Sequence, residues 1–285
     1  MKVSVVIPTC NRAHTLARAL DSVLVQTQPA AEIIVVDDGS EDETNELLQR
    51  AYPQVTTLRQ SNRGVSHARN RGIRAACHDW IAFLDSDDCW LPDKLATQVQ
   101  ALREAPAYGL CHSDEIWIRH GRRVNPMHKH AKHGGEIFLN CLPRCAISPS
   151  TTVVHKVLLE EFGGFDEALP ACEDYDLWLR ICARYPVLCI TRPLAVRYGG
   201  HADQLSQRYW GMDRFRVQAL EKLLAATDLR PDYRLAALRT IVEKLEVLAG
   251  GARKRGNTQL LRECESCSAV HIETLRALQT STRAA

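Results

Sequence analysis

The first hundred residues alternate apolar runs with stretches of helical spacing, and this alternation constrains the fold more than any other feature. Apolar, often β-branched runs occur at residues 3–8, 32–37, 55–58 and 80–84. Helical spacing is found between them, at residues 13–27, 42–51 and 65–76. Strands that are apolar throughout are buried on both faces, which is typical of a parallel sheet covered by helices. The sequence therefore predicts an α/β fold.

The rest of the chain divides into an irregular part and a helical part. Strands are expected at residues 108–118 and 150–155, and a helix at 174–185. From residue 206 onward the pattern is helical only. The helices are expected at residues 214–227, 232–248 and 258–278, separated by Pro231 and by the pair Gly250–Gly251. We therefore expect a C-terminal, all-helical appendage.

Composition excludes some classes of protein. The formal net charge is only +2, so a nucleic-acid-binding protein is not indicated. No apolar stretch approaches the ~20 residues that span a bilayer. The apolar N-terminus is short and is interrupted by Pro8, so it does not resemble a signal peptide. The sequence thus predicts a cytoplasmic protein, and leaves open an association with the inner face of the membrane.

The 11 cysteines have no regular spacing, and in a chain without an export signal most should be reduced thiols. Cys264, Cys267 and His271 fall on one helical face. They could hold zinc, but only three candidate ligands are close in sequence and there is no second CxxC pair. Plain helix packing is the alternative.

Polar clusters follow three of the expected strands, at residues 9–11, 37–38 and 85–88. In open α/β sheets, ligands bind at this carboxyl edge. No GxGxxG follows the first strand, which argues against a dinucleotide site. Three of the four residues at 85–88 are aspartates, and such a cluster favours a hard divalent cation that bridges to substrate phosphates. Capping of the next helix is the alternative.

Several segments in series resemble the family 2 glycosyltransferases, which have the GT-A fold. They are VSVVIPTCNR, VVDDGSEDET, NRGVSHARNRGI, FLDSDDCWLPDKL, and GGFDE followed by EDYDLWLR. The resemblance implies a Rossmann-like, mostly parallel sheet flanked by helices. It implies a catalytic domain at residues 1–205, with a nucleotide-sugar-binding half (1–104) and an acceptor-side half (105–205). Residues 206–285 lie outside the resemblance.

The resemblance also assigns residues to the nucleotide. Pro8 and Thr9 would lie against it, Asp38 would hydrogen-bond its base, and Asp85 would lie near the ribose or the waters of the metal. Arg69 would line the pocket and pair with base or phosphate. The alternatives are helix capping for one of the pair Asp37–Asp38 and a solvated helix face for Arg69.

The remaining assignments concern the metal and the reaction. Asp87 would bind Mn²⁺ or Mg²⁺, and His201 matches a histidine that approaches the metal or diphosphate; the alternative for His201 is a surface-loop histidine. Asp174 would be the general base that takes the proton of the acceptor hydroxyl, with Glu173 on the acceptor side. A simple N-terminal helix cap is the alternative for Asp174.

The expected function is therefore inverting, metal-dependent hexosyl transfer from a nucleoside diphosphate sugar, chiefly a UDP-sugar, to an acceptor hydroxyl in polysaccharide or glycan biosynthesis. The acceptor could be a carbohydrate, a lipid-linked molecule or another alcohol. One alternative is a non-catalytic nucleotide-sugar-binding protein. Another is a sugar nucleotidyltransferase, which the glycine-free segment after the first strand disfavours. Peripheral membrane contact and homo-oligomerisation stay open.

Overall fold

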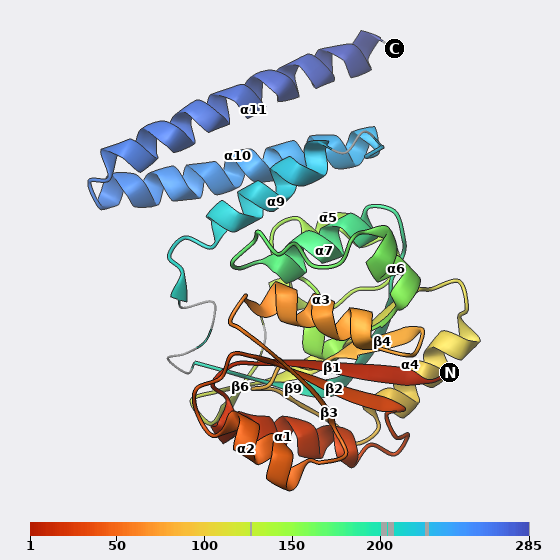
Figure 1. The fold of residues 1–285 in the computed structure, drawn as a ribbon. Coiled ribbons are helices and arrows are strands. Elements are labelled where there is room, and N and C mark those ends of the chain that lie inside the picture. Colours follow the sequence, from red (N-terminus) through yellow and green to blue (C-terminus); the bar gives the residue numbers. More distant parts are fainter. Residues whose placement is uncertain (126, 201–203, 205–207, 226–227, 285) are drawn as a thin grey trace.

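The computed structural model describes residues 1–125, 127–200, 204, 208–225 and 228–284, and its centre is a sheet with helices on both faces (Figure 1). The strands lie in the order β3-β2-β1-β4-β8-β6-β9-β5, and β7 pairs with β6. Their bounds are β1 Val3–Thr9, β2 Glu32–Asp38, β3 Thr56–Gln60, β4 Trp80–Phe83, β5 Cys89–Trp90, β6 Leu110–Arg119, β7 Arg122–Val124, β8 Val153–His155 and β9 Leu188–Gly199. The predicted α/β class is confirmed.

The first half of the sheet is parallel. β1 lies between β2 and β4, and β2 also pairs with β3, all in parallel register. Successive residues of β1 face opposite sides of the sheet. Val6 belongs to the core that includes α3 and α7, whereas Val5 and Ile7 belong to the core that includes α1 and α4. Burial on both faces explains why these strands are apolar throughout.

Helices cover both faces of this sheet. Those over the first half are α1 Ala13–Leu24, α2 Thr44–Ala51, α3 Val65–Ala75 and α4 Lys94–Glu104. Figure 1 shows α1 and α2 on one face and α3 on the other. A Cβ atom at Gly72 would come within 2.4 Å of Val6 Cγ1, so glycine allows α3 to lie close to β1. This close approach holds Arg69, one turn earlier in α3, near the sheet.

The second half of the sheet is mixed. β8 is antiparallel to both β4 and β6, and β5 is antiparallel to β9. β6 runs parallel to β9, with register shifts around Asp114. The run at 150–155, expected as one strand, is divided into a 3₁₀ turn at Pro149–Thr151 and the strand β8. Among the described residues of this half, the α-helices are α5 Phe138–Cys141, α6 Lys156–Glu161 and α7 Glu173–Cys182.

Three helices follow, namely α9 Asp213–Ala225, α10 Pro231–Lys254 and α11 Thr258–Ala284. They confirm the C-terminal helical region. The hydrophobic core on the α7 side of the sheet continues into α9 and α10. No helix among the described residues is long and apolar enough to cross a membrane.

One predicted helix boundary is wrong. The pair Gly250–Gly251 was expected to separate two helices, but α10 continues through it to Lys254. Each glycine costs a helix about 1 kcal/mol relative to alanine. The buried residues of α10 on both sides of the pair, among them Leu248 and Ala252, pack the helix against its neighbours, and such packing overrides the low helix propensity of glycine. The helix ends before Gly256, which has a φ of +66°, a backbone conformation that glycine adopts readily.

Candidate active site

Asp38, the last residue of β2, forms hydrogen bonds with the segment 60–64, which leads into α3. Its Oδ1 accepts hydrogen bonds from Gln60 Nε2 at 2.7 Å and from the N–H of Arg63 at 2.8 Å. Its Oδ2 accepts one from the N–H of Gly64 at 2.8 Å. Gly64 has a φ of +90°, which favours glycine. The buried carboxylate therefore orders a loop at the carboxyl edge of the sheet.

The neighbouring Asp37 stabilises the turn that follows β2, at residues 37–40. Its Oδ1 accepts a hydrogen bond from the N–H of Ser40 at 2.9 Å, and Arg59 Nε lies 3.5 Å from its Oδ2. The next helix, α2, follows Glu43 and has no side-chain cap. Capping of α2 is therefore not the role of either aspartate.

Pro8 and Thr9 end β1 beside this loop, and Pro8 pairs in register with Val36 of β2. Thr9 is only 3% exposed, and its hydroxyl has no hydrogen-bond partner within the described part of the chain. A buried polar atom without a partner is costly. This hydroxyl is thus a place where a bound ligand could complete the hydrogen bonding.

Ser150 organises the acidic segment 85–88. Its Oγ donates to Asp88 Oδ2 at 2.6 Å and accepts from the N–H of Asp85 at 3.1 Å. The N–H of Tyr198, from β9, donates to the other oxygen of Asp88 at 3.0 Å. Asp88 is therefore a buried structural carboxylate, whereas Asp85 and Asp87 are only half-buried. The carbonyl of Asp87 accepts a hydrogen bond from Arg18 of α1.

Arg69 joins the acidic segment to the second half of the domain. Its Nη2 donates to Asp85 Oδ1 at 2.7 Å, and its Nη1 donates to Glu173 Oε1 at 2.6 Å. Its side chain is 4% exposed. Burial lowers the pKa of Arg69, but the charges of Asp85 and Glu173 outweigh it and raise the pKa above its ordinary value. The guanidinium is therefore a permanent cation between two carboxylates.

Glu173 and Asp174 form the first turn of α7, where the helix dipole favours negative charge. Asp174 Oδ1 accepts a hydrogen bond from the N–H of Tyr175 at 2.7 Å, and its Oδ2 accepts one from the thiol of Cys145 at 3.2 Å. Burial, followed by the charge of Asp174, raises the pKa of Cys145 well above its ordinary value. The thiol is thus a neutral donor to a half-buried carboxylate.

Two charged residues of the site were missed by sequence reasoning. Arg197 on β9 lies among carboxylates: burial lowers the pKa of its guanidinium, but the charges of Glu115, Asp88 and Asp174 outweigh burial and raise that pKa above its ordinary value. Glu115 on β6 is buried and pairs with Lys132 at 3.1 Å. Their only signal in the sequence was a charged residue within a strand. The register shift beside Asp114 lies directly before Glu115.

The predicted residues fall into three groups. Pro8, Thr9 and Asp38 lie at the ends of the neighbouring strands β1 and β2. Asp85 and Glu173 contact the same guanidinium, so the segments that carry Asp87 and Asp174 meet across Arg69. The alternative of a solvated helix face for Arg69 is wrong, because the residue is buried. His201 lies outside the described residues.

The acidic segment has the chemistry of a divalent-cation site. Its donors are hard carboxylate oxygens, the ligands that Mg²⁺ and Mn²⁺ prefer. Burial, then the charges of Asp87 and Asp85, raise the pKa of Asp88 well above its ordinary value. A cation beside Asp87 would relieve this repulsion, so the residues fit the predicted metal.

Sequence comparison places the chain in a known family. Residues 4–144 match the family described as Glycosyl transferase family 2, and residues 126–228 match Glycosyltransferase like family 2. The chain belongs to glycosyltransferase family 2. It is 32% identical over 202 residues to an uncharacterized glycosyltransferase of Rickettsia felis, and 38% identical over 120 residues to one of Nostoc. These matches cover 70% and 41% of this chain, but only 33% and 37% of the two relatives.

Solved structures show the same fold. S. aureus TarS 1–349, crystallised with UDP-GlcNAc, has a TM-score of 0.71 and 17% identity, over 99% of this chain and 92% of that one. The mannosyltransferase PcManGT of Pyrobaculum calidifontis, in complex with GDP-Man and Mn²⁺, has a TM-score of 0.61 and 21% identity. That match covers 98% of this chain and 86% of the other. At these identities the likeness establishes the GT-A fold.

Proposed function

We propose that this glycosyltransferase moves a sugar from a nucleoside diphosphate sugar, chiefly a UDP-sugar, to an acceptor hydroxyl with inversion at the anomeric carbon. The observation that carries the proposal is the bridge from Asp85 through Arg69 to Glu173. It joins the acidic segment to helix α7, which supports a site where donor and acceptor would meet. The solved neighbours, which hold UDP-GlcNAc and GDP-Man, support a nucleotide-sugar donor.

The donor half would be held by the carboxyl edge of the sheet. Asp38 would bind the base, while Pro8 and Thr9 would border the nucleotide. Mn²⁺ or Mg²⁺ held by Asp87, with His201 as a further ligand, would supply Lewis-acid stabilisation of the leaving diphosphate. Arg69 would act by positioning Asp85 and Glu173, since both of its terminal nitrogens are already bound to carboxylates.

Asp174 would act as the general base. Its carboxylate would take the proton from the acceptor hydroxyl as the oxygen attacks the anomeric carbon, opposite the diphosphate. The N–H of Tyr175 and the thiol of Cys145 would fix its orientation. Glu173 would position the acceptor side through Arg69. Surface-polysaccharide or glycan biosynthesis is the corresponding class of pathway.

The test is a panel of nucleoside diphosphate sugars incubated with the protein, with and without Mn²⁺. We expect Mn²⁺-dependent release of nucleoside diphosphate from a UDP-sugar and an inverted anomeric configuration in the product, read by NMR. Retention of configuration would overturn the inverting mechanism. Binding of the donor without any release or transfer would support the non-catalytic alternative.

A further inference from the structure

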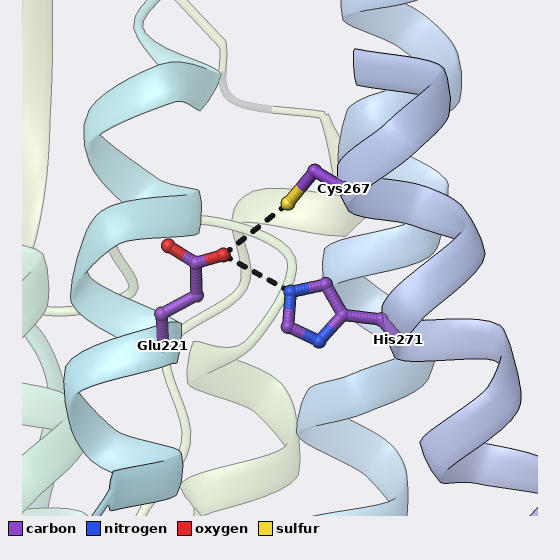
Figure 2. A group of neighbouring side chains, drawn as sticks. All are labelled: Glu221, Cys267 and His271. Atoms are coloured by element: carbon purple, nitrogen blue, oxygen red, sulfur yellow. Dashed lines mark hydrogen bonds and ion pairs between the residues drawn. The ribbon is translucent and has the colours of Figure 1, made fainter. Parts of the chain in front are cut away.

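Glu221 of α9 and two side chains of α11 bring an oxygen, a sulfur and a nitrogen together (Figure 2). Glu221 Oε1 lies 3.0 Å from His271 Nε2 and 3.4 Å from Cys267 Sγ. All three donor atoms lie within 4.8 Å of one another. The helices thus gather three metal-ligating groups of different chemistry at one point.

These distances suit a coordination shell. Zinc bonds of about 2.0 Å to oxygen or nitrogen and about 2.3 Å to sulfur separate tetrahedral ligands by about 3.3 to 3.7 Å. The distance from Glu221 Oε1 to Cys267 Sγ is in this range, and that to His271 Nε2 is slightly shorter. Small side-chain rotations would open the group around an ion. Cys267 and His271 are four residues apart on α11, and such residues share a helix face.

The ligand chemistry points to zinc. A thiolate and an imidazole select borderline-soft ions such as Zn²⁺ over Mg²⁺ or Ca²⁺, and a carboxylate is a common third zinc ligand. Burial, followed by the hydrogen bond to Glu221, raises the pKa of Cys267 to about 11. The thiol therefore keeps its proton in the absence of an ion, and metal binding would release that proton to solvent.

The structure revises the membership of the group suggested by the sequence. Cys264 is only 4% exposed and belongs to the hydrophobic core. Its place among the three donors is taken by Glu221, which precedes Cys267 by 46 residues. The next residue of α9, Lys222, pairs with Asp176 of α7 at 3.0 Å. α9 therefore contacts α11 through Glu221 and the helix of Asp174 through Lys222.

We propose that Glu221, Cys267 and His271 bind one Zn²⁺, with water in the fourth position, and that the ion fastens α11 to α9. Glu221 is exposed while Cys267 and His271 are half-buried, so an ion and its water can enter from solvent. The site is separate from the acidic segment around Asp87. It does not depend on the proposed transfer reaction.

The first experiment uses the full chain, stripped of metal by a chelator and titrated with Co²⁺. We expect one equivalent of Co²⁺ to give a thiolate-to-cobalt charge-transfer band with tetrahedral ligand-field absorption, and Zn²⁺ to displace it. Cys267→Ala and His271→Ala should abolish the band. Glu221→Gln should weaken affinity at least about tenfold, since even outer-shell changes cost about 10- to 100-fold.

Matched controls separate this site from others. Glu273→Gln removes an exposed carboxylate of the same helix and should leave the band and affinity unchanged. Cys89→Ser tests the cysteine beside the acidic segment, and Asp87→Ala tests that segment itself; both should keep the band. Zn²⁺ should raise the midpoint of thermal unfolding of the wild type and of Asp87→Ala, but not of His271→Ala.

The outcomes are distinct. A wild-type protein that gives no thiolate band with Co²⁺ overturns the proposal. Glu221, Cys267 and His271 would then form only a hydrogen-bonded cluster. A band that persists in both Cys267→Ala and His271→Ala assigns it to other cysteines, which also overturns the proposal. If Cys267→Ala does not fold, Cys267→Ser and His271→Ala give the same decision.

Discussion

Arg69 Nη1 lies 2.6 Å from Glu173 Oε1, although 104 residues separate the two positions. Burial and the charge of Asp174 raise the pKa of Glu173 while Arg69 lowers it, and the net pKa lies above its ordinary value. The guanidinium thus stabilises the charged form of this buried carboxyl group. This buried ion pair therefore joins helix α3 to helix α7 beside the acidic segment.

Replacing Arg69 by methionine should destabilise the protein by about 3–5 kcal/mol, because it leaves the buried carboxylate of Glu173 and the half-buried one of Asp85 without their partner. The measurement is the free energy of unfolding in urea. Arg74→Met, an exposed arginine of the same helix, is the control and should cost little. Adding Glu173→Gln to Arg69→Met should recover part of the loss. A loss below about 1 kcal/mol would contradict the role of the pair.

Asp174→Asn should lower the rate of transfer by about 10²- to 10⁴-fold, the usual contribution of a general base. The affinity for the donor should stay close to that of the wild type, because the proposed base would act on the acceptor hydroxyl and not on the donor. Single-turnover rates and donor titration by calorimetry measure the two quantities. Full turnover in this variant would exclude Asp174 as the base.

Asp87→Ala should remove the dependence of the reaction on Mn²⁺ and weaken binding of the nucleoside diphosphate. The variant would lack the carboxylate that would hold the cation, and with it the charge that the cation would supply to the diphosphate. Titration with UDP in the presence and absence of Mn²⁺ checks this. Asp79→Ala, which removes an exposed carboxylate before β4, should behave as the wild type. Equal metal dependence in the two variants would refute the assignment.

Asp38→Asn should weaken donor binding and loosen the segment 60–64. An asparagine has one acceptor oxygen, and the carboxylate now accepts three hydrogen bonds, from Gln60, Arg63 and Gly64. Losing a hydrogen bond to a charged group costs about 1.5–3 kcal/mol. Hydrogen exchange of the Gly64 amide and calorimetry with UDP would measure the two effects. Unchanged protection of that amide would contradict the expectation.

Lys94 predicts a pH dependence of stability. It is fully buried, with its Nζ 3.3 Å from the carbonyl of Thr152, and burial lowers its pKa to about 7. In the unfolded chain its pKa is about 10.4. Between these values the unfolded state binds a proton that the folded state does not, so this group makes stability rise with pH. The stability gained by deprotonation of Lys94 is therefore fully present above about pH 10.4 and is lost as the pH falls toward about 7.

The advantage of Lys94→Met over the wild type should therefore be greatest at or below neutral pH and shrink toward about pH 10, by at most about 1.4 kcal/mol per pH unit. Urea unfolding at several pH values checks this. Lys254→Met, at the exposed end of α10, should show no such trend. A constant difference between Lys94→Met and the wild type would mean that the buried amine stays charged.

The sequence was sufficient for the parallel half of the fold. Burial on both faces requires apolar strands, and the polar residues at their carboxyl ends, such as Thr9 and Asp38, then fall at one edge of the sheet. The same reasoning placed Asp85 there. These inferences depend on local pattern and on chain order, which sequence contains directly.

Contacts between distant segments were beyond this reasoning. The resemblance placed Arg69 at the nucleotide pocket, with a solvated helix face as the alternative, and only its contacts with Phe165 and Glu173 show that it is buried. Arg197 and Glu115 could not be recognised because a register shift in β6 decides where nearby side chains lie. Glu221 could not be grouped with Cys267 because it lies 46 residues earlier in the chain. Cys264 was grouped with Cys267 because the two are close in sequence.

The hydroxyl of Ser150 has a consequence for the order of events during synthesis. Asp88, whose carboxylate it holds, leaves the ribosome 62 residues earlier. A nascent chain can already contain the parallel strands and the aspartates at 85–88 before Ser150, whose hydroxyl binds their turn, has been synthesised. The turn at residues 85–88 should therefore become ordered late, only after the middle of the polypeptide has emerged and β8 has joined the sheet.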